Sequence, residues 1–314
     1  MELRLLLILT KNMINRICNF FNTQFLIAIF VSLLISILFQ DIRHKILSSE
    51  NCKSDISRPV VIGYGEGTFK IGELLYSDSF HDESEWVVQI QDSDTDSNPA
   101  IKFGDGMLEV VMPDRGATIW NQNKFSGSIA ITYKVKASTD LLHKDGIAVR
   151  DINTFWHASD PENPEAIFDY SKYTGAFNSY HKQYGYYASI GGRENTTTRF
   201  RRYPRSTPDG KPVKHISLAD KDGIEGYLIQ PDKTHSIQLV AFEDIVQYIV
   251  DEKVVYEIRE GDSVTISVPD GSIESVEYTK EQFLFFSKGW FGFRLVNSHH
   301  YFSDFKVYSL EPVD

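Results

Sequence analysis

Residues 128–135 read SIAITYKV, in which Ile129, Ile131, Tyr133 and Val135 alternate with smaller or more polar residues. Alternation with a period of two is typical of a β-strand that buries one face. The pattern returns at 106–111, 236–240 and 246–250, and residues 251–253 (DEK) follow the last of these as a hairpin turn. No long helical spacing occurs after residue 40. We therefore predict an all-β fold, a two-sheet sandwich or jelly roll over residues 74–312.

The composition limits the function classes. The formal net charge of −11 disfavours a general nucleic-acid binder, which needs a basic face. Two cysteines cannot form a disulfide framework, and no P-loop, dinucleotide-binding turn, GxSxG elbow or zinc cluster is present. Aromatic residues make up 13% of the chain, and such residues both favour strands and stack on flat ligands such as sugars.

The amino terminus is typical of a targeting segment. Residues 25–39 read FLIAIFVSLLISILF, without a charge, and Arg4, Lys11 and Arg16 precede them. This length lies between that of a secretory signal and that of a spanning helix, and a buried core helix is the alternative. We predict a signal peptide or membrane anchor over 1–40 and a linker over 41–73. The rest of the chain would then be exported to the periplasm or cell surface, with membrane contact only through this segment.

Several segments combine polar and aromatic residues. Residues 150–161 (RDINTFWHASDP), if extended, place Asp151, Asn153, Phe155 and His157 on one face. Neither face is cleanly apolar, which indicates a strand that borders a cavity; an edge strand is the alternative. Residues 180–193 contain four tyrosines beside glycines, which favours a ligand groove over simple packing.

Arginines recur in the next segment. In residues 195–205 (NTTTRFRRYPR), alternation places Arg199, Arg201 and Tyr203 on one face. Two guanidinium groups there would bind a carboxylate or sulfate, unless they pair internally with the many acidic residues. Residues 289–300 (GWFGFRLVNSHH) place Arg294 opposite an apolar face and end in a histidine pair. No metal-binding pattern accompanies this pair, and we predict no cofactor.

One loop suggests a structural metal. Residues 93–98 (SDTDSN) alternate carboxylates, which suits calcium, but the loop lacks the glycine and distal glutamate of the helical calcium hand. A solvated turn is the favoured interpretation, with structural calcium as the alternative.

Residues 151–161, 175–203 and 289–310 together resemble a bacterial family of jelly-roll proteins, catalogued as a domain of unknown function and found among polysaccharide-utilisation genes. The resemblance covers about residues 74–310. It implies a concanavalin-like fold, similar to lectins and to some polysaccharide lyases, and one relative is thought to dehydrate ulvan oligosaccharides. The chain departs from the family at His157, where methionine is usual, and at 259–283, which resembles an insertion.

The resemblance implies a functional hypothesis. The protein would be a carbon–oxygen lyase that removes water from the non-reducing-end uronic acid of ulvan-type oligosaccharides, leaving a 4,5-unsaturated uronate. A non-catalytic carbohydrate-binding module, or a polysaccharide lyase or glycoside hydrolase on an acidic polysaccharide, is the alternative. The predicted catalytic residues are Tyr187, His299 and Arg201. The predicted substrate-binding residues are Asn153, Trp156, Tyr184, Arg199 and Arg294.

Overall fold

The computed structural model describes residues 69–205, 215–217, 227–267 and 272–313. The apolar run at 25–39 and the predicted linker, up to residue 68, lie outside these residues. Within the described ranges, no helix is long and apolar enough to cross a membrane.

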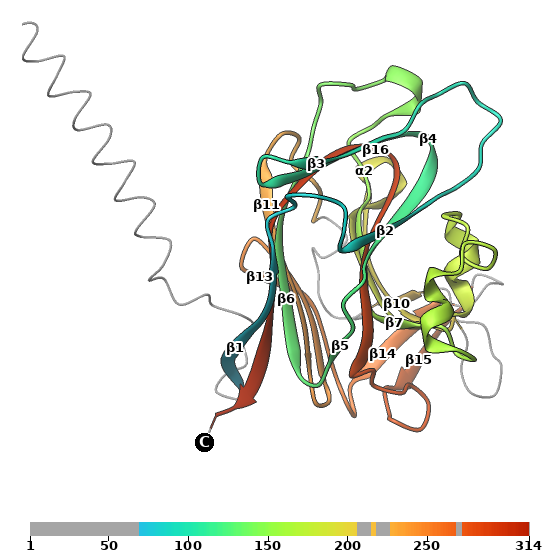
Figure 1. Ribbon diagram of the computed structural model, residues 1–314. Helices are drawn as coiled ribbons and strands as arrows, with labels where there is room; N and C mark the ends of the chain where they lie inside the picture. Colours follow the sequence, from blue (N-terminus) through green and yellow to red (C-terminus); the bar gives the residue numbers. More distant parts are fainter. Residues whose placement is uncertain (1–68, 206–214, 218–226, 268–271, 314) are drawn as a thin grey trace, which may run out of the picture. The chain divides into compact units, whose positions relative to one another are not determined.

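The described chain is built almost entirely of strands (Figure 1). The strands are β1 (Phe69–Asp78), β2 (Trp86–Ile90), β3 (Ala100–Gly104), β4 (Met107–Asn121), β5 (Phe125–Ser126), β6 (Ile129–Ala137), β7 (Ile152–Ser159), β8 (Tyr184–Gly191), β9 (Thr197–Tyr203), β10 (His215–Ser217), β11 (Thr234–Phe242), β12 (Ile245–Val250), β13 (Lys253–Arg259), β14 (Ser263–Ser267), β15 (Ile273–Glu277) and β16 (Lys288–Pro312). The short helical segments are η1 (Lys144–Gly146), η2 (Pro164–Phe168), η3 (Phe177–Lys182) and α2 (Gly192–Asn195).

The long strand β16 connects the two layers of the sandwich. Its first half pairs with β4 and β7, and the sheet continues through β8, β9 and β10 to β14 and β15. Its second half pairs with β6 and β1, and β6 leads on to β11, β12 and β13. The predicted all-β sandwich is confirmed. The predicted turn is the hairpin between β12 and β13, where Asp251 and Glu252 have φ angles of 48° and 65°.

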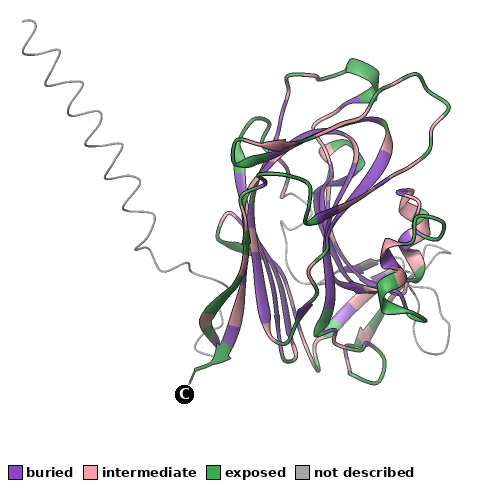
Figure 2. Cartoon of the chain, in the orientation of Figure 1, coloured by how far each residue is buried: buried purple, intermediate pink, exposed green. Residues whose placement is uncertain are grey.

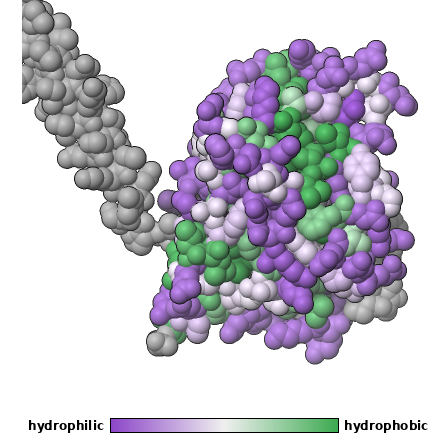
Figure 3. Space-filling model, in the orientation of Figure 1, coloured by the Kyte–Doolittle hydropathy of each residue, from purple (hydrophilic) through white to green (hydrophobic). Residues whose placement is uncertain are grey.

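The main core lies between the layers, where buried residues line the facing strands (Figure 2). It is rich in aromatic rings. Phe293 of β16 packs against Tyr133 of β6, with ring centroids 5.1 Å apart, and against Phe302 farther along β16, at 4.1 Å. Hydrophobic residues also reach the surface in patches between hydrophilic ones (Figure 3). Among the described residues, Ile273 and Leu284 are the most exposed of the larger ones, at 71% and 57%.

A second, smaller core covers the outer face of the layer that contains β7 and β8. The chain between these strands, which includes η2 and η3, packs back onto that face. Gln89 of β2 holds it there, because its Oε1 accepts hydrogen bonds from Trp120 Nε1 and the Tyr180 hydroxyl, each at 2.8 Å. Its Nε2 donates to the Ile167 carbonyl at 3.0 Å. This covered outer face carries the candidate site.

Candidate functional site

Five of the eight predicted site residues lie together on the outer face of the β16–β7–β8–β9 sheet. The register pairs Arg294 with Asn153, Asn153 with Ser189, and Ser189 with Arg199. Directly paired residues of antiparallel strands point to the same face, so these side chains form one row. The next row on this face pairs Tyr187 with Arg201. We call this set the arginine face: Asn153, Tyr187, Arg199, Arg201 and Arg294.

Two of the guanidinium groups are buried. Arg201 and Arg294 are only 7% and 3% exposed, whereas Arg199 is partly exposed. The carbons at the centre of the Arg201 and Arg294 guanidinium groups lie 5.4 and 5.5 Å from the ring of Phe177 in η3. Arg294 Nη1 also donates to the Ala117 carbonyl at 2.7 Å. Among the residues that the structure describes, none of the three arginines forms an ion pair with a carboxylate. The sequence-based alternative, internal pairing with acidic residues, is therefore not what the structure shows.

An acidic residue also acts on this face. The charge of Asp151, immediately before β7, influences Tyr187 and all three arginines. Its carboxylate is already engaged by Arg150 Nε, and its Oδ1 accepts from Asn153 Nδ2 at 3.3 Å. Asp151 was not selected from the sequence, although its alternation with Asn153 places both on one face. The arginine face therefore keeps an excess of positive charge.

The Tyr187 hydroxyl remains protonated. Tyr187 is 5% exposed, and burial raises its pKa well above the ordinary value of about 10, although nearby Arg201 acts in the opposite direction. A base would need a lowered pKa, whereas burial raises the pKa of Tyr187. Tyr187 is suited to donate a hydrogen bond or a proton.

Three predicted site residues lie elsewhere. Trp156 is fully buried in the main core, 5.3 Å from the Tyr186 ring, because it faces the inner side of β7. Tyr184, at the start of β8, is exposed and stacks on Phe286 with ring centroids 5.6 Å apart. His299 lies beyond a bulge in β16, and its Nε2 pairs with Glu109 Oε1 at 3.0 Å. These three residues therefore lie apart from the arginine face, and their roles in substrate binding or catalysis stay predictions.

Phe177 and His181 of η3 join the site, and sequence reasoning did not select them. His181 is partly buried and lies edge-on to Phe177, with ring centroids 5.4 Å apart. The only sequence signal was the density of polar and aromatic residues around 180–193. Their helical turn packs against strands that are distant along the chain, which the sequence pattern does not reveal.

The candidate calcium loop is filled by a side chain. Arg115 Nη2 donates to the carbonyl oxygens of Thr95 and Ser97, at 3.3 and 2.8 Å. A guanidinium group therefore binds two backbone oxygens of this loop. In the described ranges, no group of three or more histidine, cysteine or acidic side chains could hold a metal.

Comparison with known proteins places this geometry in context. Residues 111–268 match the family described as "Domain of unknown function (DUF6250)", a range that contains all of the arginine face except Arg294. No curated protein matches the chain.

Solved structures share the fold at low identity. A Bacillus subtilis protein of unknown function with a galectin-like fold is 17% identical, with a TM-score of 0.50, over 77% of this chain and 98% of that one. The carbohydrate-binding module CBM66 from Bacillus subtilis is 13% identical, with a TM-score of 0.40, over 72% and 96%. A structure titled for endo-acting O-glycanases of the human gut microbiota is 10% identical, with a TM-score of 0.45, over 75% and 99%. The first of these supports the galectin-like fold.

Proposed function

We propose that this chain, which belongs to the DUF6250 family, binds an acidic sugar on its arginine face and eliminates water from the uronic acid of an ulvan-type oligosaccharide. The observation that carries this proposal is the group formed by Arg199, Arg201 and Arg294, which lack a carboxylate partner among the described residues. Buried charges are ordinarily paired, so a site with this excess of positive charge is suited to an anionic ligand.

The chemistry of the face fits a uronate carboxylate. A guanidinium group can donate two parallel hydrogen bonds to a carboxylate, and such charge-assisted bonds are about twice as strong as neutral ones. Elimination across C4–C5 builds up negative charge on this carboxylate after the C5 proton leaves. Donors already fixed around the carboxylate stabilise that charge without reorganisation. Arg199, Arg201 and Arg294 would supply this stabilisation, with the Asn153 amide beside them.

The departing hydroxyl group needs a proton. Tyr187 carries a protonated hydroxyl in the row next to Arg199 and Asn153, and its ring lies 5.5 Å from the Arg201 guanidinium group. Transfer of this proton to the 4-hydroxyl group would release water. Tyr187 therefore takes the role of the general acid in this proposal.

One reaction separates the proposal from its alternatives. Ulvan oligosaccharides with a saturated uronate at the non-reducing end are incubated with the protein, and mass spectrometry follows the products. Loss of one water without chain shortening, with new ultraviolet absorbance from the unsaturated uronate, supports dehydration. Shortened chains indicate lysis or hydrolysis of an internal linkage. Binding without any mass change indicates a carbohydrate-binding module.

Two variants assign the site. Arg201→Gln and Tyr187→Phe should each lose most of the dehydration rate. The first removes a guanidinium group that would donate hydrogen bonds to the carboxylate of the sugar, and the second removes the proposed general acid. Arg202→Gln is the matched control, since Arg202 points to the inner side of β9, where its Nη2 donates to the Leu284 carbonyl. Wild-type rates in both site variants would contradict the assignment.

A further inference from the structure

Asn153 lies in the middle of the arginine face. In the register of the sheet it stands between Arg294 of β16 and Ser189 of β8, and Arg199 of β9 follows Ser189 in the same row. Directly paired residues have Cβ atoms about 4.5–5.5 Å apart. A sugar whose carboxylate binds these guanidinium groups would therefore lie against the Asn153 amide.

The amide of Asn153 has a fixed orientation. Its Nδ2 donates to Asp151 Oδ1 at 3.3 Å, and a carboxylate oxygen can only accept, so the amide nitrogen rather than the amide oxygen faces Asp151. An ion pair between Asp151 Oδ2 and Arg150 Nε holds the carboxylate in place. The amide cannot turn over without losing its contact with Asp151, and Asn153 Oδ1 consequently points away from that carboxylate.

Asn153 Oδ1 is a buried acceptor without a hydrogen-bond partner among the described residues. Asn153 is only 5% exposed, and buried acceptors are nearly always satisfied. Because an amide oxygen can only accept, its missing partner is a donor. The hydroxyl groups of a sugar are donors, whereas an ionised carboxylate or sulfate group offers only acceptors.

The rest of the face offers few acceptors to a ligand. The three guanidinium groups can only donate, and both oxygens of Asp151 are engaged, by Asn153 and by Arg150. Tyr187 donates its proton in the proposed reaction, and the Ser189 hydroxyl can donate as well as accept. Asn153 Oδ1 is therefore an acceptor that is fixed in orientation and still lacks a partner in the described part of the chain.

We propose that Asn153 Oδ1 accepts a hydrogen bond from a ring hydroxyl group of the sugar and so selects sugar acids over other carboxylates, an inference that rests on the proposed function. The guanidinium groups bind the carboxylate, which by itself leaves the sugar ring free to rotate. A second contact on the ring fixes its orientation relative to Tyr187 in the next row. Asp151 acts as a positioning residue, because it keeps the amide of Asn153 in one orientation.

Calorimetry on the full-length protein compares D-glucuronate with tetrahydropyran-2-carboxylate, which keeps the ring and the carboxylate but has no hydroxyl group. The wild type should bind D-glucuronate at least about tenfold more tightly, because only the sugar satisfies Asn153 Oδ1. Asn153→Leu, which keeps a side chain of similar shape, should reduce this preference about tenfold. Equal affinities in the wild type, or an unchanged preference in Asn153→Leu, would overturn the inference and leave the proposed function standing.

Asn121→Leu is the matched control. Asn121 is also a buried asparagine, but its Nδ2 donates to the Tyr76 hydroxyl at 3.2 Å and its Oδ1 accepts from the Asn123 backbone N–H at 3.0 Å. Asn121→Leu should therefore keep the wild-type preference for D-glucuronate. An equal loss of preference in Asn121→Leu would overturn the assignment to Asn153.

Nuclear magnetic resonance of the wild-type protein covers the case in which a variant does not fold. The side-chain amide ¹⁵N signal of Asn153 should move downfield when D-glucuronate saturates the site, and it should stay near its original position with tetrahydropyran-2-carboxylate. Saturable binding of D-glucuronate without this difference would overturn the role of Asn153 alone. No binding of D-glucuronate and no dehydration by the wild type would overturn the proposed function together with the inference.

Discussion

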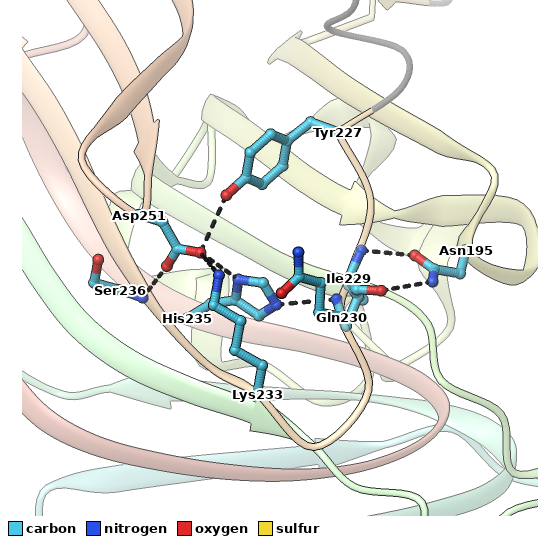
Figure 4. Close-up of polar contacts among 8 residues, drawn as sticks. All are labelled: Asn195, Tyr227, Ile229, Gln230, Lys233, His235, Ser236 and Asp251. Atoms are coloured by element: carbon cyan, nitrogen blue, oxygen red, sulfur yellow. Dashed lines mark hydrogen bonds and ion pairs between the residues drawn. The ribbon is translucent and has the colours of Figure 1, made fainter.

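Two polar clusters in this protein differ in whether their hydrogen bonds are complete. In the first, centred on Asp251, the carboxylate accepts from the Tyr227 hydroxyl, Lys233 Nζ, His235 Nδ1 and the Ser236 backbone N–H, at 3.2, 2.8, 2.9 and 2.9 Å (Figure 4). His235 Nε2 in turn accepts from the Gln230 backbone N–H at 3.2 Å. Both nitrogens of this histidine are therefore occupied.

A neighbouring asparagine completes the first cluster. Asn195 accepts from the Ile229 backbone N–H at 2.8 Å and donates to the Ile229 carbonyl at 2.9 Å (Figure 4). These contacts join α2 to the chain that leads into β11. An Asp–His pair in a sequence often suggests catalysis, but here the partners of both residues are internal. The cluster stabilises the fold.

In the second cluster, the arginine face, several buried polar atoms have no hydrogen-bond partner in the described structure. Arg201 Nε and Arg294 Nε are buried without a hydrogen-bond partner in the described structure, as is Asn153 Oδ1. Buried polar groups are nearly always satisfied, and exceptions require an explanation such as an absent ligand. Arg202 Nε, on the inner side of β9, also lacks a partner in the described structure, so unsatisfied atoms alone do not mark a site. The arginine face is the better candidate for function because its guanidinium groups gather on one face without a carboxylate partner among the described residues, whereas both nitrogens of His235 are occupied.

The largest expected effect is the difference between variants at Arg201 and Arg202, which lie on opposite faces of β9. Arg201→Gln should reduce dehydration and the affinity for D-glucuronate by about 100-fold or more, because it removes a preorganised donor. Its thermal midpoint should not fall, since an unpaired buried charge is lost. Arg202→Gln should do the opposite, losing stability with little effect on binding. Isothermal calorimetry and thermal unfolding check both variants, and equal losses of binding would contradict the contrast.

The next effect concerns the cluster centred on Asp251, in which the hydrogen bonds are complete. Asp251→Ala should lower the free energy of unfolding by about 3 kcal/mol, because it removes four hydrogen bonds to a charged group and leaves their donors unpaired. Urea unfolding measures this change. Binding of D-glucuronate below the unfolding transition should be unaltered, and a specific loss of affinity would show that the cluster does more than stabilise.

A smaller effect is expected at Gly116, which makes room for Arg294. A Cβ atom at this position would lie 2.3 Å from Arg294 Nη2 and 2.6 Å from Nη1. Gly116→Ala should displace the guanidinium group and weaken D-glucuronate binding about tenfold, at a cost of about 1 kcal/mol in stability. Calorimetry and urea unfolding separate the two effects. Unchanged affinity would indicate that Arg294 does not contact the sugar.

The smallest effect is a dependence on pH. Burial acts to raise the pKa of Asp251, but hydrogen bonds from His235, Lys233 and the Ser236 backbone outweigh it, and the pKa lies far below its ordinary value. A depressed pKa stabilises the folded state above the unfolded pKa of about 3.9, and this contribution is lost as the pH falls further. The stability gap between wild type and Asp251→Asn should be constant from pH 7 to about 5 and narrow below about pH 4. A constant gap at lower pH would contradict this origin.

The sequence predicted those parts of the site that depend on the alternation of side chains along a single strand. Alternation along 199–203 placed Arg199, Arg201 and Tyr203 on one face, and the register confirms it. Alternation along a single strand does not place His299. A bulge between Val296 and Ser298, with Asn297 at φ of 48°, shifts the alternation along β16 and directs His299 toward Glu109.

The sequence by itself determined the strands and the polarity of each strand's two faces, because these depend on side-chain alternation between near neighbours in the chain. Only the tertiary structure decided which face was inside and which strands met. It buried Trp156 in the main core and brought Arg294 beside Asn153, although 141 positions separate these last two in the chain. It also packed His181 against Tyr203. Pairing and layer packing depend on contacts between distant segments, which no local pattern in this chain encodes.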